Sequence, residues 1–154
     1  MNRDAIGWAW VAGQAVLLGA LIFLPSGDAW SKPGLLQLAA NVLFFGGLGL
    51  IAVAALRLGG ALTPTPVPTR SGELATSGLY RFVRHPIYTG VLLVVAGVTL
   101  RSGNWLHVAI AAATVVFFDR KAAWEEQQLA QHYGGYAEYA ARTPKFIPGL
   151  RPRR

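Results

Sequence analysis

Two long apolar runs in the first half of the chain limit its possible folds more than any other feature. Residues 6–24 contain no charged side chain, and residues 34–58 contain only Arg57, near their end. At 1.5 Å per residue, a helix over either run would cross a hydrocarbon core of about 30 Å. Each run therefore predicts a transmembrane helix. The first is also longer than the apolar core of a cleaved signal peptide, about 7 to 15 residues, so we interpret it as a helix of the protein.

The composition agrees with a membrane protein. Of 154 residues, 53% are hydrophobic and 14% are charged, which leaves too little polar surface for a soluble globule of this size. The chain has no cysteine, so disulfides and thiolate ligands are excluded, and its three histidines are too scattered to predict a metal site. Basic residues that flank the apolar runs carry the net charge of +7. Anionic lipids and membrane topology account for them, so we expect contact with membrane lipids and no binding of nucleic acid.

Two shorter apolar runs, residues 87–100 and 104–118, are separated by the turn-forming sequence Arg101-Ser102-Gly103-Asn104. They predict a helical hairpin whose apolar parts would each measure about 21 to 23 Å. The sequence leaves open whether both helices span the membrane completely. We expect a single all-α domain over residues 1–154, a polytopic membrane protein with a cytosolic C-terminal helical extension and four transmembrane helices, at about residues 6–24, 34–58, 86–101 and 104–120.

The distribution of basic residues predicts the orientation of this arrangement. With four crossings, twelve of the fourteen lysines and arginines lie on the side that holds both termini, and only Lys32 and Arg101 lie on the other side. By the positive-inside rule, both termini are expected in the cytoplasm. Arginine outnumbers lysine 11 to 3, which suggests a GC-rich genome and hence a bacterial cytoplasmic membrane.

A dense polar cluster, Arg84-His85-Pro86-Ile87-Tyr88-Thr89-Gly90, immediately precedes the third apolar run. Pro86 suits the first turn of a helix, so His85 is expected at or near the N-cap, with Tyr88 and Thr89 on the same face. Polar groups at a membrane boundary are costly to desolvate, and a helix N-terminus attracts anions. The cluster fits either a functional site or an interfacial anchor.

A second polar group, Glu125-Glu126, follows the fourth apolar run. No helix breaker occurs before Gly134-Gly135, so the fourth helix is expected to continue out of the membrane to that point. In an antiparallel hairpin, Pro86 is level with about residue 119, and Glu125 lies roughly 9 Å further out, a gap that a nucleoside-sized ligand would bridge. The two glutamates point about 100° apart. We therefore expect one to face the site and the other to face solvent or a basic neighbour, although a solvated helix end also fits this stretch.

Two further patterns have specific interpretations. Tyr136 and Tyr139, after the glycine pair, predict a short helix whose aromatic side chains rest on the bilayer or fold back over the site, with Arg142 available to an anion. The run Gly47-Leu48-Gly49-Leu50-Ile51-Ala52 matches a dinucleotide-binding fingerprint, but it lies within an apolar helix without a preceding strand. Close packing of helices through small residues is the better interpretation of that run.

Together, these motifs resemble the isoprenylcysteine carboxyl methyltransferase family and its phospholipid methyltransferase relatives. The resemblance covers about residues 76–148 and rests on Gly78-Leu79-Tyr80, the run from 84 to 90, Glu125-Glu126, and Tyr133-Gly134 followed by Tyr136, Tyr139 and Pro144. It implies an integral membrane enzyme that transfers a methyl group from S-adenosylmethionine to a lipophilic small-molecule or lipid acceptor, through a carboxylate or an amine. The chain is shorter than the eukaryotic members, so their prenyl-protein substrate is not carried over.

The resemblance also implies roles for individual residues. The cofactor-binding residues would be Tyr80, Arg84, His85, Tyr88, Glu125 and Glu126, and no metal is implied. Glu125 and Arg142 would be the catalytic residues, with Arg142 holding an anionic group of the acceptor. Two alternatives stay open, an NADPH-dependent membrane reductase of the steroid-reductase type and a non-catalytic membrane scaffold. The sequence predicts neither the acceptor nor the oligomeric state.

Overall fold

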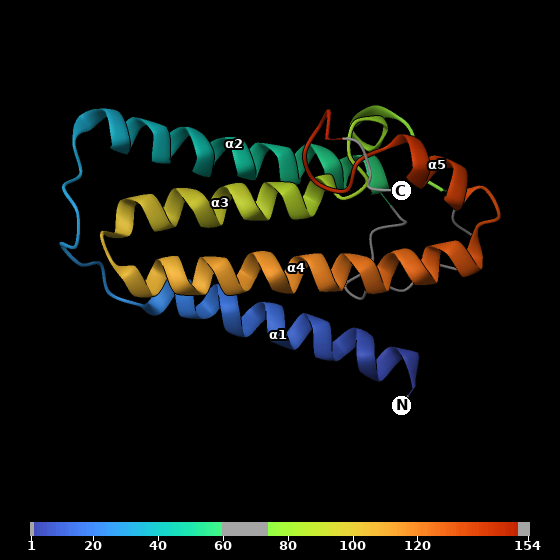
Figure 1. Ribbon diagram of the computed structural model, residues 1–154, viewed down its shortest axis with the longest axis horizontal. Coiled ribbons are helices and arrows are strands. Elements are labelled where there is room, and N and C mark those ends of the chain that lie inside the picture. Colours follow the sequence, from blue (N-terminus) through green and yellow to red (C-terminus); the bar gives the residue numbers. More distant parts are fainter. Residues whose placement is uncertain (1, 60–73, 151–154) are drawn as a thin grey trace.

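The computed structural model describes residues 2–59 and 74–150, and every regular element within these ranges is helical. Four long helices run along one axis, and in Figure 1 they follow one another in the order α2, α3, α4, α1. The start of α1, the end of α2, the start of α3 and the whole of α5 lie at the same end of the bundle. The elements in chain order are α1 (Arg3–Phe23), α2 (Gly34–Leu58), the 3-10 helix η2 (Gly78–Arg81), α3 (Pro86–Ser102), α4 (Trp105–His132) and α5 (Tyr136–Arg142).

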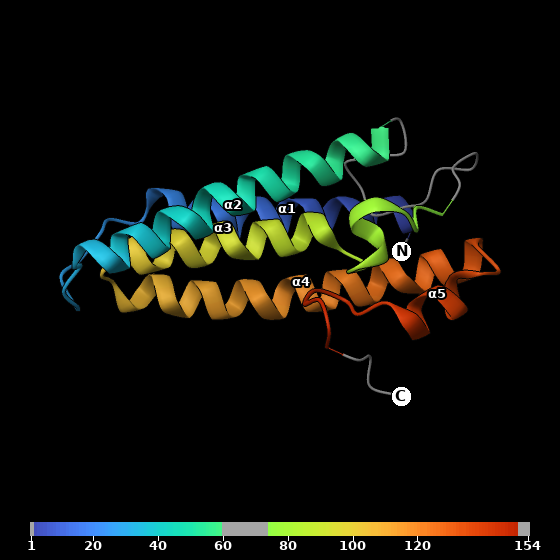
Figure 2. The same ribbon diagram turned by 90° about the horizontal axis from the view of Figure 1, so that it is seen from above.

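The predicted hairpin is formed by α3 and α4 (Figure 2). Gly103 between them has a φ of 62°, a conformation that costs glycine little, and the Asn104 side chain caps α4 by accepting a hydrogen bond of 2.9 Å from the Leu106 amide. The loop after α1 closes this end, because the Gly27 amide donates to the Ser102 carbonyl over 2.7 Å. At its other end α4 continues to His132, which confirms the predicted extension.

The closest helix packing in the molecule is between α2 and α3, and glycines make it possible. A Cβ added to Gly47 would lie 2.6 Å from the Gly90 carbonyl oxygen, and a Cβ added to Gly90 would lie 2.7 Å from the Gly47 carbonyl oxygen. A Cβ on Gly97 would come equally near the Ala40 carbonyl oxygen, at 2.6 Å. The two backbones are therefore in direct contact, and the interpretation of the glycine run in α2 as a packing motif is confirmed.

This packing makes a prediction about stability. Replacing Gly90 by alanine is expected to lower the free energy of unfolding by about 1 to 3 kcal/mol, because the new methyl group meets backbone on α2 and forces the helices apart. Gly46 is the matched control, since a Cβ there has nothing within 4 Å, and alanine at that position is expected to be neutral or slightly stabilising. Unfolding of both variants in detergent checks this. Equal transition midpoints would contradict the packing argument.

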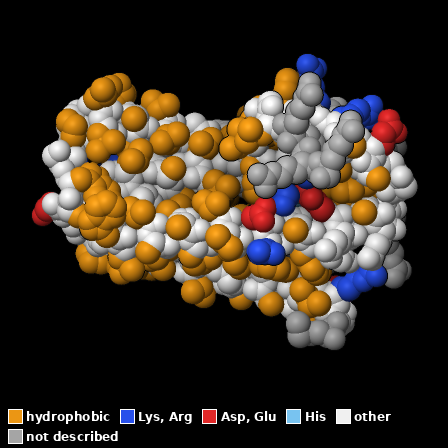
Figure 3. All heavy atoms as spheres, in the orientation of Figure 1, with side chains coloured by type: hydrophobic (Ala, Val, Ile, Leu, Met, Phe, Trp, Pro, Cys, Tyr) orange, Lys and Arg blue, Asp and Glu red, His pale blue; other side chains and the backbone are white. Residues whose placement is uncertain are grey.

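The surface of the bundle is that of a membrane protein over most of its length. Both α1 and α2 are long and apolar enough to cross a membrane, whereas α3, with 17 residues, is a shorter apolar helix. Figure 3 shows apolar side chains over the body of the molecule and most charged ones towards the end that carries α5. Large exposed apolar side chains of α2 include Leu35, Leu38, Val42, Phe45 and Leu56. Crossing of the membrane by α3 and α4, and the cytoplasmic position of both termini, stay predictions.

Candidate functional site

The predicted polar motifs meet at one end of the bundle, where main-chain hydrogen bonds hold the chain ahead of α3 against the chain that follows α5. The Arg84 amide donates to the Pro144 carbonyl over 2.9 Å, and the His85 amide donates to the Lys145 carbonyl over 3.1 Å. One turn into α3, the Thr89 hydroxyl donates to the Phe146 carbonyl over 2.9 Å. Residues 84–89 are thus held by α3 and by residues 144–146, which we call the tail.

Glu126 is the centre of a buried charge cluster. Its Oε1 accepts a hydrogen bond from the Arg84 Nε at 2.9 Å and lies 2.9 Å from the His85 Nε2. Burial alone would raise the pKa of Glu126, but the hydrogen bonds and charges of His85 and Arg84 outweigh it and lower the pKa to about 2. The carboxylate is therefore ionised at any physiological pH, and it fixes the direction in which the imidazole ring points.

Glu125, the residue before Glu126 in α4, also contacts residues at the start of α3. The Tyr88 hydroxyl donates to its Oε2 over 2.7 Å, and the His85 Nδ1 lies 3.6 Å from the same oxygen. The rings of His85 and Tyr88 are stacked, with centroids 5.2 Å apart. In the described part of the chain, the second carboxylate oxygen of Glu125 has no hydrogen-bond partner, and its side chain keeps 25% of its exposure.

The structure corrects the predicted gap between the two motifs. Glu125 was expected roughly 9 Å beyond the level of Pro86, with a ligand-sized gap between the motifs, but the Tyr88 hydroxyl contacts Glu125 directly, so the side chains leave no such gap. The reason is that side chains on an α-helix lean towards its N-terminus. At this end of an antiparallel hairpin, Tyr88 leans outwards from the start of α3 and Glu125 leans inwards along α4, so the two approach each other. Glu126 has the basic neighbour that was expected, but it shares His85 with Glu125.

Arg84 holds the C-terminal end of α5 as well as Glu126. Its Nη1 donates to the Ala140 carbonyl over 2.9 Å and to the Thr143 carbonyl, and only 9% of its side chain is exposed. These carbonyls belong to the last turn of a helix, where the backbone supplies no donor. The resemblance implies that Arg84 binds a cofactor, whereas its hydrogen bonds in the structure position Glu126 and α5.

Tyr80 has a similar joining position. Its hydroxyl lies 3.5 Å from the Ala54 carbonyl of α2, and its own carbonyl accepts a hydrogen bond of 2.5 Å from the Tyr139 hydroxyl of α5. Burial raises the pKa of Tyr139 to about 12, while the charge of Arg84 lowers this pKa slightly and that of Glu126 raises it slightly. The hydroxyl therefore stays protonated and continues to donate. Of the two positions predicted for the tail aromatics, Tyr136 and Tyr139 take the one over the site, since both are buried.

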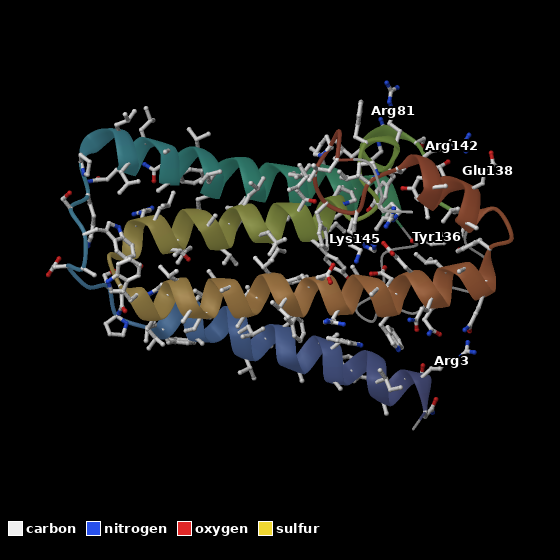
Figure 4. The ribbon with its side chains drawn as sticks, viewed as in Figure 1. Arg3, Arg81, Tyr136, Glu138, Arg142 and Lys145 are labelled. Carbon is white, nitrogen blue, oxygen red and sulfur yellow. The ribbon has the colours of Figure 1, made fainter. Side chains whose placement is uncertain are left out.

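Arg142 is the predicted site residue that the structure does not bring into the cluster. Its side chain is 72% exposed and pairs with Glu138 over 3.4 Å, one turn earlier in α5. Figure 4 shows these two side chains on the outer side of α5, with Tyr136 on the side towards α4. A role for Arg142 in holding the acceptor stays a prediction.

Sequence reasoning missed Lys121, which it counted only among the basic residues beside the membrane. The structure buries this lysine, with 4% exposure, and its Nζ donates to the Gln14 side chain of α1 over 2.5 Å. Its position one turn before Glu125 on the same face of α4 was the available signal. Two further buried polar atoms, the Gln128 Oε1 and the Tyr136 hydroxyl, have no hydrogen-bond partner among residues 2–59 and 74–150.

A sequence profile of phospholipid methyltransferases matches residues 36–135. The chain belongs to the phospholipid methyltransferase family. The fold agrees, because the eukaryotic intramembrane Ras methyltransferase ICMT superposes with a TM-score of 0.69 over 99% of this chain and 53% of that one, at 21% sequence identity. The resemblance proposed from the sequence motifs is thereby confirmed.

The names of individual relatives of this chain describe different activities. Protein-S-isoprenylcysteine O-methyltransferase B of Arabidopsis thaliana is 40% identical over 79 residues, which are 49% of this chain and 40% of that protein. The cobalt-zinc-cadmium resistance protein CzcN of Cupriavidus metallidurans is 31% identical over 154 residues, 97% of this chain and 66% of that protein. Methanethiol S-methyltransferase 1 of Bradyrhizobium diazoefficiens is 34% identical over 74 residues, 47% of this chain and 25% of that protein. The chain thus spans from a quarter to two thirds of these relatives.

Proposed function

We propose that this protein is an integral membrane methyltransferase that uses S-adenosylmethionine to methylate a lipophilic acceptor. The observation that carries the proposal is the convergence of His85 and Tyr88 with Glu125 and Glu126 at the polar end of an apolar bundle. Buried ionisable groups at a membrane boundary are costly, and here they form one connected cluster in a chain of a methyltransferase family. An interfacial anchor needs no such convergence.

The residues present fit a nucleoside-based sulfonium cofactor. The free carboxylate oxygen of Glu125 is available to a positively charged ligand, and the unpartnered Gln128 Oε1 and Tyr136 hydroxyl lack the partners that buried polar groups normally have. Burial, followed by the charge of Glu126, raises the pKa of Tyr136, which agrees with a protonated hydroxyl close to the cluster. The hydroxyl and amino groups of a nucleoside would satisfy both atoms. When bound, such a cofactor supplies an electrophilic methyl group on a positively charged sulfur.

The chain's own residues would contribute alignment, charge and exclusion of water. Methyl transfer from a sulfonium is an in-line displacement, so precise placement of donor and acceptor matters more than acid–base chemistry. Glu126 and Arg84 fix the imidazole of His85, and the Tyr88 hydroxyl fixes Glu125, so the ligand-facing groups are oriented before binding. The catalytic role proposed for Glu125 is to bind a positively charged group of the donor and so to hold the donor in line with the acceptor.

The acceptor is proposed only by its chemical class. The exposed apolar faces of the helices allow a lipophilic molecule to approach from the membrane, and the relatives' names include an isoprenylcysteine-modified protein and methanethiol as acceptors. Apolar acceptors of different sizes are thus compatible with this family. With both termini in a bacterial cytoplasm, as the basic residues predict, the cofactor would enter from the cytosol and the acceptor from the bilayer.

Calorimetric titration of the purified chain in detergent tests this function against both alternatives. We expect S-adenosylhomocysteine, the stable product of the donor, to bind with one site per chain and NADPH to give no heat of binding. Binding of NADPH alone would instead support a membrane reductase. Binding of neither ligand, by protein that unfolds cooperatively, would support a non-catalytic scaffold.

A further inference from the structure

Lys121 is a buried cation that protein groups satisfy only in part. An ammonium group has three N–H donors, and within the described residues the Lys121 Nζ uses one of them, towards Gln14. That partner is a neutral amide, and Lys121 forms no ion pair with a carboxylate of the described chain. Burying a charge is expensive unless it is paired and fully hydrogen-bonded. Two of its N–H donors therefore have no hydrogen-bond partner among the described residues, and no carboxylate there forms an ion pair with it.

The position of Lys121 places it at the candidate site. Its Nζ lies 5.2 Å from the centroid of the Tyr88 ring and 5.7 Å from that of the Phe118 ring. The Tyr88 ring is the one that stacks on His85, and its hydroxyl donates to Glu125. The Tyr88 ring thus separates Lys121 from His85 and Glu125, two of the residues predicted to bind the cofactor, while Gln14 of α1 contacts the lysine directly.

Lys121 and Glu125 present opposite charges one turn apart on the same helix. The free carboxylate oxygen of Glu125 can accept hydrogen bonds from a cation, and the two unused N–H groups of Lys121 can donate to an anion. Within the described residues no hydrogen bond or ion pair joins the two side chains, so each keeps hydrogen-bonding groups for a ligand. A ligand with an ammonium and a carboxylate bonded to the same carbon atom would complement both. The amino-acid end of S-adenosylmethionine has this arrangement.

We propose that Lys121 binds the α-carboxylate of the methyl donor while Glu125 accepts the α-ammonium group. This inference rests on the proposed function and extends it to one end of the cofactor. Gln14 then has a positioning role, since its hydrogen bond directs the lysine and ties α1 to the site. A carboxylate on the acceptor has the same chemistry, but it would leave the adjacent free oxygen of Glu125 without a cation.

The test compares two ligands that differ by one carboxylate, S-adenosylhomocysteine and its decarboxylated analogue S-adenosyl-3-thiopropylamine. Calorimetry on the wild-type chain is expected to show that S-adenosylhomocysteine binds about 10- to 100-fold more tightly, the contribution of a hydrogen-bonded charge pair. In Lys121→Met the ratio of the two affinities is expected to fall to about one. Affinity for the decarboxylated ligand should change less than about threefold, which also shows that the variant is folded.

Matched variants separate a binding role from a structural one. Arg120→Met removes a positive charge from the neighbouring, exposed position of α4 and is expected to keep the wild-type preference. Gln14→Leu removes the tie to α1 but keeps the cation, so it should retain most of the preference even where it lowers stability.

Three results would overturn the inference. Equal affinity of the wild-type chain for both ligands would do so, whatever the variants do. A preference that persists in Lys121→Met would place the donor's carboxylate elsewhere and leave the proposed function intact. Failure of the wild-type chain to bind either ligand would overturn the proposed function together with this inference.

Discussion

Replacing Glu126 by alanine is expected to lower the free energy of unfolding by about 3 to 5 kcal/mol, the usual effect of removing one partner of a buried ion pair. The substitution leaves the Arg84 guanidinium and the His85 imidazole without their shared acceptor in a site where both side chains are less than a tenth exposed. Arg84 then also loses the contact that orients it towards α5. The measurement is the unfolding midpoint of the full chain in detergent.

Two variants make this result specific to the cluster. Glu126→Gln keeps the shape and one acceptor oxygen but not the charge, so it is expected to destabilise less than alanine. Glu138→Gln removes an equal charge from an exposed ion pair and should change stability by less than about 1 kcal/mol. If Glu126→Ala and Glu138→Gln unfolded at the same midpoint, the central position of Glu126 would be disproved.

The pH dependence of stability follows from the same carboxylate. Its pKa in the folded protein, about 2, lies below the ordinary value of 4.5 that applies when the chain is unfolded. The stabilisation by ionised Glu126 is therefore fully present above about pH 4.5 and is lost as the pH falls towards 2. Glu126→Gln should remove this part of the acid dependence, so the difference in stability between wild type and variant should shrink over that interval.

Replacing Glu125 by glutamine is the prediction with the largest expected effect on ligand binding. We expect affinity for S-adenosylhomocysteine to fall about 30-fold or more, because a charge pair in a desolvated site is lost. Stability should change little, since the glutamine oxygen can still accept the hydrogen bond from the Tyr88 hydroxyl. Calorimetry with the protein in detergent measures the change.

The control for Glu125 keeps the carboxylate but frees it to rotate. Tyr88→Phe removes the hydroxyl that fixes Glu125 and is expected to weaken binding by a smaller factor than Glu125→Gln. Equal affinity of Glu125→Gln and wild type would exclude this residue from the cofactor site, even if the protein binds the cofactor elsewhere.

Features governed by local chemistry could be predicted from the sequence. The turn at Gly103, the cap at Asn104 and the continuation of α4 to His132 follow from residues next to one another in the chain. The presence of His85 and the glutamate pair at the same end of the hairpin could also be predicted, because a tight hairpin fixes which residues lie at one end. Only one of the two glutamates was expected to face the site, whereas His85 lies beside both. The family resemblance followed from the same motifs.

Features that depend on side-chain direction or on distant packing could not be predicted. Counting residues along two helix axes predicted a gap between the level of Pro86 and Glu125, because the count ignores the opposite lean of the Tyr88 and Glu125 side chains. Lys121 was taken for a topological charge, since its burial depends on residues of other helices, Gln14 of α1 and Tyr88 of α3. Arg84 and Arg142 look alike in sequence, yet carbonyls of α5 surround one while the other faces outwards. Residues 144–146, which bind residues 84–89, show no periodic sequence pattern from which these hydrogen bonds could be predicted.

That tail has a consequence for how the protein is made. Synthesis proceeds from the N-terminus, so the acceptors at Thr143, Pro144, Lys145 and Phe146 leave the ribosome after every charged side chain of the cluster has already been added. The site can therefore be completed only after residue 146 has left the ribosome. A premature stop codon within α5 would yield a chain that still contains His85, Glu125 and Glu126 but lacks the carbonyl groups that hold Arg84 in place.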